Sequence, residues 1–119
     1  MPHHQHMDTA VRDCIQECLA CYQSCLESVH HCLMVGGAHA APGHVALLLA
    51  CATACEASAR VTLLGAEQHA ALCAACSTVC RQCAEACRQM AGGDETMARC
   101  AAACDRCAES CERMARRST

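Results

Sequence analysis

The sequence predicts an all-α protein, an up-down-up-down antiparallel four-helix bundle with a cysteine-lined core. Cysteines recur within segments at intervals of three, four or seven residues, the spacing of helix positions that face a bundle core. Glycine, proline and cap-type residues divide the chain into four segments with short links, which favours antiparallel neighbours. Alanine, glutamate and arginine favour helix over strand. The 119 residues suffice for one domain, expected to span 1–119.

The first helix is expected to begin at the cap-type residues Asp8 and Thr9 and to run to about Val35, where Gly36 and Gly37 stop it. Besides its cysteines, it carries a second row of apolar residues that we expect to pack between helices and between subunits. These residues are Val11, Ile15, Leu19, Tyr22, Leu26, Val29 and Leu33.

The other three helices are marked in the same way. Pro42 suits the first turn of the second helix, and Gly65 ends it. The third helix follows almost at once and ends at Gly92 and Gly93. Asp94 caps the fourth helix, and the tail RMARRST closes the chain. The histidine-rich residues 1–7 are expected to be a flexible, solvated segment.

All sixteen cysteines fall on the predicted core faces, and we expect all of them to bind metal. They are Cys14, Cys18, Cys21, Cys25, Cys32, Cys51, Cys55, Cys73, Cys76, Cys80, Cys83, Cys87, Cys100, Cys104, Cys107 and Cys111. Imidazole and thioether groups in or near the ends of the same rows are further candidate ligands: His31, His44, His69, Met90, Met97 and Met114.

Two thiols four residues apart on a helix favour a bridging metal over a disulfide. Their Cβ atoms lie about 5–6 Å apart, whereas a disulfide needs about 3.8 Å. Two metal–sulfur bonds placed end to end span about 4.6 Å, which such a pair can reach. The chain holds seven C-x-x-x-C pairs, so the pattern is specific.

The ligand chemistry favours Cu(I). Thiolate, thioether and imidazole together select soft ions, and one Cu(I) per thiolate leaves a buried core without net charge. An isolated zinc site of four thiolates would carry two negative charges. A zinc or general thiolate buffer and a disulfide-rich structural protein remain the alternatives. The motifs of di-iron, iron–sulfur and thioredoxin-like enzymes are absent or incomplete, so we expect no catalysis.

Composition limits the partners. A formal charge of −3 without a basic block in the helices gives no reason to expect nucleic acid. No stretch approaches the length of a membrane span, and we expect no membrane partner. The first residues show no apolar segment of a secretory signal, so we expect a cytoplasmic location, where thiols stay reduced.

The repeated C-x-x-x-C pairs, from about Cys14 to Met114, resemble those of the bacterial copper storage proteins, in particular their cytosolic branch. The resemblance implies storage of many Cu(I) ions, held by pairs of thiolates with sulfurs shared between neighbouring ions. It further implies His or Met ligands near the ends and a homotetramer. A copper chaperone or small thiol carrier is an expected partner. If each thiolate bridges two ions and each ion takes two thiolates, the thiolates hold roughly sixteen Cu(I), and terminal His and Met extend the range to roughly 16–20 per chain.

Weak thioether and imidazole ligands at an end of the bundle would suit an entry path, because they pass the ion inward. We expect copper to enter at the end that gathers His31, Met34, His44, Met90 and Met97. The opposite end gathers Met7, His69 and Met114.

Overall fold

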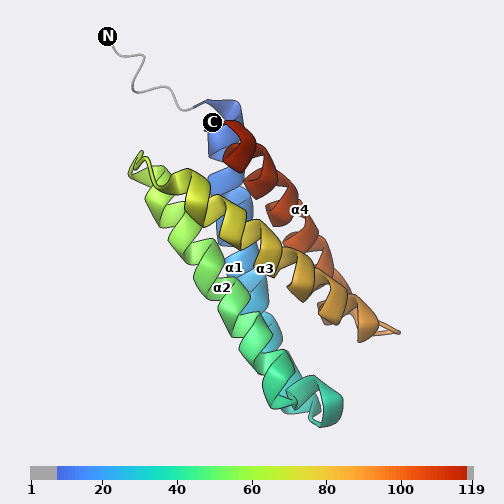
Figure 1. The fold of residues 1–119 in the computed structure, drawn as a ribbon. Helices are drawn as coiled ribbons and strands as arrows, with labels where there is room; N and C mark the ends of the chain where they lie inside the picture. Colours follow the sequence, from blue (N-terminus) through green and yellow to red (C-terminus); the bar gives the residue numbers. More distant parts are fainter. Residues whose placement is uncertain (1–7, 118–119) are drawn as a thin grey trace.

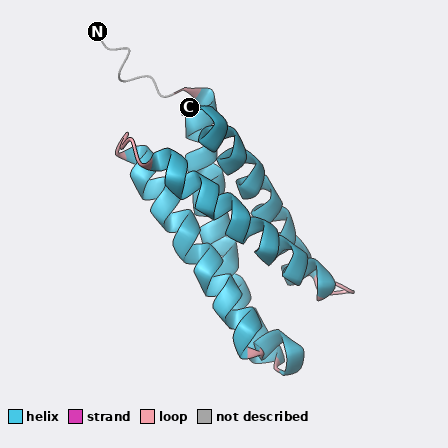
Figure 2. Cartoon of the chain, in the orientation of Figure 1, coloured by secondary structure: helices cyan, strands magenta, loops and turns pink. Residues whose placement is uncertain are grey.

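The computed structural model describes residues 8–117 and confirms the all-α bundle. Four long helices follow one another with short connections, and no strand occurs within 8–117 (Figure 2). The expected flexible segment, residues 1–7, lies outside the described residues. The elements are α1 (Thr9–Val35), the 3₁₀ turn η2 (Gly37–Ala40), α2 (Pro42–Leu63), α3 (His69–Gln89) and α4 (Glu95–Arg117).

The helices form a square, antiparallel arrangement. Helix α1 packs against α2 and α4, and α3 packs against the same two helices (Figure 1). The bundle therefore has two ends. The η2 end contains η2 and the turn between α3 and α4. The α2–α3 end contains the turn between those helices, the start of α1 and the finish of α4.

The predicted helix ends are close to those observed. The Asp8 carboxylate accepts the backbone N–H of Ala10 at 2.8 Å and caps α1. Gly36 follows α1 with φ +79°, which a residue with a side chain rarely adopts. The short turn η2 was not predicted, because four residues between Gly36 and Ala41 are too few for a helical pattern. Helix α4 continues through Arg117 and takes up most of the expected tail.

Helix α2 corrects the expectation that no segment resembles a membrane span. It is long and apolar enough to cross a membrane by length and composition alone, with a mean hydropathy of 1.4 over its best window. Its buried face, however, carries His44, Cys51 and Cys55 against the other helices. A core helix of a bundle satisfies the same criterion.

The second row on α1 lies partly outside the core, since Val11, Tyr22 and Val29 pack against it but three leucines do not. Leu19, Leu26 and Leu33 are 42%, 39% and 58% exposed, whereas Ile15 is buried. Leu49 on the neighbouring α2 is also exposed. The expected packing between helices thus holds for only part of the row, and the exposed leucines leave an apolar strip on the surface.

Candidate metal centre

All sixteen cysteines lie in the centre of the bundle, as their spacing predicts. Each thiol is free, and no cysteine exposes more than 1% of its surface. They pack with buried alanines of α2, α3 and α4, together with Leu48 and Met97, which are fully buried. The column of thiols therefore takes the place that large aliphatic and aromatic side chains fill in an ordinary core.

Sulfur atoms of different helices are in contact along this column. The Sγ–Sγ distances run from 3.6 Å for Cys55 and Cys80 to 4.0 Å for Cys14 and Cys111. Helix α2 reaches α4 across the centre, since Cys51 lies 3.9 Å from Cys104. A pair within one helix, Cys76 and Cys80, is also close, at 3.7 Å. The C-x-x-x-C spacing predicts pairs of thiols along single helices, but sulfur–sulfur contacts between helices are more numerous.

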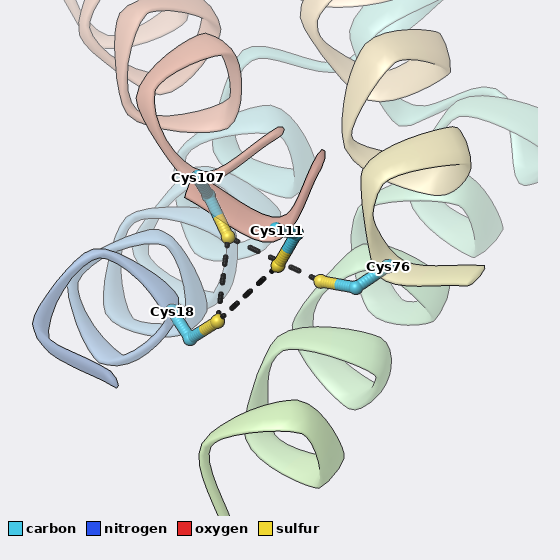
Figure 3. Close-up of side chains that lie close together, drawn as sticks. All are labelled: Cys18, Cys76, Cys107 and Cys111. Atoms are coloured by element: carbon cyan, nitrogen blue, oxygen red, sulfur yellow. Dashed lines mark hydrogen bonds between the residues drawn. The ribbon is translucent and has the colours of Figure 1, made fainter. Parts of the chain in front are cut away.

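The sulfurs gather into groups of four in which all Sγ atoms lie within 4.8 Å of one another. Figure 3 shows one group, with Cys18 from α1, Cys76 from α3, and Cys107 and Cys111 from α4. Ordered from the η2 end, five groups are Cys25/Cys83/Cys100/Cys104, Cys21/Cys25/Cys51/Cys104, Cys21/Cys51/Cys55/Cys80, Cys55/Cys76/Cys80/Cys107 and Cys18/Cys76/Cys107/Cys111. Each group shares two cysteines with the next, so the five form one continuous column.

Three thiols of this column, Cys32, Cys73 and Cys87, have raised pKa values and stay protonated when no metal is bound. Burial and the nearby Asp94 charge raise the pKa of Cys32. Hydrogen bonds with Cys100 and Cys83, together with burial, raise the pKa of Cys87. The contact with Cys111 lowers the pKa of Cys73, but the contact with Cys14 and burial outweigh it and raise that pKa to about 11. Metal binding must therefore release protons.

At the η2 end the column continues into soft ligands. The Cys32 thiol lies 3.8 Å from the Met97 sulfur. His44 is 8% exposed, and neither ring nitrogen has a hydrogen-bond partner among the described residues. Burial, followed by the proximity of His39, lowers the pKa of His44 and keeps the ring neutral. A buried imidazole without partners is costly, and a metal ion would satisfy one of its nitrogens. Met90 is half-buried.

A carboxylate holds two histidines over the same end. Asp94 Oδ2 lies 2.8 Å from His31 Nε2 and 3.0 Å from His39 Nε2. The other oxygen of Asp94 accepts the backbone N–H of Met97 at 3.1 Å and caps α4. These three side chains, which we call the Asp94 clasp, join α1, η2 and α4. The sequence predicts His31 as a metal ligand, but it does not predict the hydrogen bond between His31 and Asp94.

The α2–α3 end carries the remaining candidates. Met114 is buried, and His69 is half-buried with its Nδ1 donating to the Ala66 carbonyl at 2.9 Å. Cys14 and Cys73 are the last thiols before this end on their helices. The structure thus divides the described histidine and methionine candidates between the two ends as expected, while Met7 lies outside the described residues.

Non-thiol residues occupy the same core positions where cysteine is missing. Ser28 lies between Cys25 and Cys32 on α1, is fully buried, and its hydroxyl has no hydrogen-bond partner among the described residues. Ser58 and Thr62 continue the α2 row, and Leu48 precedes it. The sequence also indicates this position. Cys25 and Cys32 are seven residues apart, and the heptad pattern places a further core position three residues after Cys25, at Ser28.

Comparison with known proteins identifies relatives of this fold and this thiol column. The profile of the copper storage protein family matches residues 7–116. Among curated proteins, none matches significantly. Among solved structures, the Nmul_A1745 protein of Nitrosospira multiformis is 35% identical, with a TM-score of 0.85, and the match covers 92% of this chain and 98% of that one.

Two similar structures contain copper. The Cu(I)-bound copper storage protein BsCsp3 is 27% identical, with a TM-score of 0.82 and coverage of 90% of this chain and 99% of that one. A cytosolic copper storage protein from Streptomyces lividans, loaded with five coppers, is 30% identical, with a TM-score of 0.79 and coverage of 90% and 92%.

Proposed function

Because the chain belongs to the copper storage protein family, we propose that it stores and buffers Cu(I), with roughly 16–20 ions per chain held mainly by the core thiolates. The proposed ligands are the sixteen cysteines, supplemented at the ends by histidine and methionine. The two copper-containing relatives support Cu(I) as the ion.

The continuous sharing of sulfurs carries this proposal. Consecutive groups of four have two cysteines in common, so filling one group places an ion beside the ligands of the next. A thiolate can bridge two Cu(I) ions, and a column of shared sulfurs therefore suits a chain of closely spaced ions. Small rotations of the side chains would widen contacts of 3.6–4.0 Å to the roughly 4.6 Å of a two-coordinate bridge.

Zinc is the chief alternative, and the distances by themselves also suit it. Four sulfurs around a tetrahedral ion at about 2.3 Å lie roughly 3.8 Å from one another. Zinc sites that are separate from one another, however, can form in only three of the five groups. The first, third and fifth groups have no cysteine in common. Three isolated sites would place six negative charges in a core without compensating cations, whereas Cu(I) balances each thiolate.

We rank the proposed histidine and methionine ligands by their burial and by the hydrogen bonds that they already make. His44 and Met97 are buried at one end of the column, and Met114 and His69 lie at the other. Met90 is half-buried. His31 is already engaged by Asp94, so its use as a ligand requires that hydrogen bond to break.

Metal competition tests the choice of ion. Reduced protein would be offered Zn(II) and Cu(I) in separate and mixed titrations without oxygen. The proposal predicts that zinc saturates at about three ions per chain, one for each group of four that shares no cysteine with the others, and that Cu(I) displaces it. Retention of zinc against an excess of Cu(I) would favour the zinc buffer.

Counting the free thiols of the protein before it is reduced for the titration tests the disulfide alternative. That alternative predicts far fewer than sixteen free thiols.

We also propose a cytoplasmic location, a homotetramer and a copper chaperone or small thiol as the source of copper. The S. lividans relative is a cytosolic protein, which supports the location. The exposed leucine strip on α1 supports assembly, since contiguous apolar surface favours a protein partner. Storage without catalysis is proposed on membership of the copper storage protein family.

A further inference from the structure

The α2–α3 end of the bundle contains a pocket in line with the thiol column. Each helix contributes the core position that follows its last thiol, three, four or seven residues away. These are Val11 on α1, Thr62 on α2, His69 on α3 and Met114 on α4. Together with Gly65 they line an open pocket of about 130 Å³. A wider hollow of about 340 Å³ adjoins it, lined by Val11, His69 and Met114 and also by Glu67 and Arg117.

The lining of this pocket is chemically suited to Cu(I). The Ala66 carbonyl accepts a hydrogen bond from His69 Nδ1, so in the neutral ring Nε2 is the nitrogen with a lone pair. Met114 supplies a thioether, a soft ligand. Thr62 is 7% exposed, and its hydroxyl is buried and has no hydrogen-bond partner among the described residues. Glu67 and Arg117 have opposite charges, so softness rather than net charge sets the selectivity.

The opposite end is more firmly covered. Met97 is fully buried and His44 is 8% exposed, and the Asp94 clasp joins three elements above them. At the α2–α3 end, His69 and Met114 themselves line the hollow.

We propose that the α2–α3 end is a second copper port, in which His69 and Met114 take up Cu(I) and pass it to the thiols behind them. This inference rests on the proposed storage function. The receiving thiols are Cys73, four residues from His69, and Cys111, three residues from Met114. Cys111 contacts Cys14 at 4.0 Å and Cys18 at 3.7 Å, which leads the ion into the column.

The transfer is a ligand exchange without a redox step. A Cu(I)–ligand bond of the incoming complex breaks as bonds to His69 nitrogen and Met114 sulfur form. These bonds then give way to Cu–S bonds with two thiolates, whose protons pass to solvent or to the departing ligand. One N–H group of Arg117 lies 3.9 Å from the Met114 sulfur while another binds Asp8 at 2.7 Å, so the contact with Met114 must break before that sulfur binds an ion.

Loading kinetics test the port. Reduced protein would be mixed without oxygen with the Cu(I) complex of a chromogenic chelator, and the loss of colour would give both the rate and the final capacity. The variant His69→Ala/Met114→Leu should load severalfold more slowly but lose only about two ions of capacity, one per ligand removed. Met97→Leu, a change of the same kind at the η2 end, is the matched control and should load faster than the double variant.

Loading of His69→Ala/Met114→Leu at the wild-type rate would overturn the port. If that variant loses helical structure, Met114→Leu alone serves, because this exchange conserves volume. It should also load more slowly than wild type, and an unchanged rate would again overturn the proposal. Failure of the wild-type protein to take more than a few ions would instead refute the storage function, so the two failures are distinguishable.

Discussion

At the scale of single residues, position along the core row decides whether a side chain serves the metal column. On every helix, the core positions are spaced three and four residues apart. The residues beside these positions face alanines, neighbouring helices or solvent. Ser28 and Ser24 on α1 illustrate the difference. Ser28 is fully buried between Cys25 and Cys32, whereas Ser24 is only half-buried and lies off the row.

Ser28→Cys should therefore increase the tightly bound copper by about one ion per chain. The new thiol completes the α1 row and removes a buried hydroxyl that lacks a partner, so stability should not fall. Ser24→Cys adds a thiol on the same helix outside the row and is the matched control. Equal gains in the two variants, measured by copper retained against a chelator, would show that position in the row does not matter.

Removing thiols should lower capacity without removing the fold. Cys83 belongs to the group nearest the η2 end, and Cys87 interacts with Cys83 and Cys100. The double variant Cys83→Ala/Cys87→Ala should remain helical, lose about 1 kcal/mol of stability per small cavity, and hold fewer ions. Ser77→Ala, a buried change on α3 outside the row, should keep full capacity. Unchanged copper stoichiometry in the double variant would refute the assignment of these two ligands.

At the scale of elements, the helix boundaries followed from the sequence, but the contacts at their ends did not. Asp8, Pro42 and Gly36 mark helix ends through local backbone chemistry, which a sequence displays directly. The Asp94 clasp depends on bringing His31 and His39 to one carboxylate from 63 and 55 residues away. Sequence spacing carries no information on such distant pairs, which explains why Asp94 was predicted only as a cap.

Asp94→Ala should lower the urea midpoint of the metal-free protein at pH 7, because it removes a helix cap and the partner of two histidines. Hydrogen bonding from His31 lowers the pKa of Asp94 to about 2 from 3.8. A lowered folded-state pKa contributes stability above pH 3.8, and this contribution is lost as the pH falls towards 2. The difference between variant and wild type should therefore shrink over that range. Glu95→Ala, which removes an exposed acid next in sequence, is the control.

At the scale of the whole molecule, the sequence predicted the bundle and the members of its core, but not the grouping of the sulfurs. The three-and-four spacing determines which residues face inward. The stagger and rotation of the helices determine which sulfurs meet, so contacts such as Cys51 with Cys104 across the centre emerged only in the folded chain. The apolar character of α2 was also underestimated, because its cysteines and alanines were not counted as a continuous apolar stretch.

Copper loading should raise the thermal stability of the whole bundle. The core contains neither Phe nor Trp, so the metal-free protein relies on small side chains. Ions that bind the folded state alone stabilise it by mass action. Melting curves with and without Cu(I) measure this effect, and an unchanged melting temperature would contradict it.

The apparent affinity for Cu(I) should rise with pH, because thiols with raised pKa values, such as Cys32, must lose protons when they bind the ion. Competition with a Cu(I) chelator at pH 6.5 and 8 measures this effect.

The most direct test of the storage column is its capacity. Reduced, metal-free protein would be titrated with Cu(I) in competition with a tight chromogenic Cu(I) chelator, without oxygen. The shared column of sixteen thiols predicts well over ten ions per chain, retained against the chelator. Retention of only a few ions, or none, would contradict the account and leave the thiols to zinc, to disulfides or to packing.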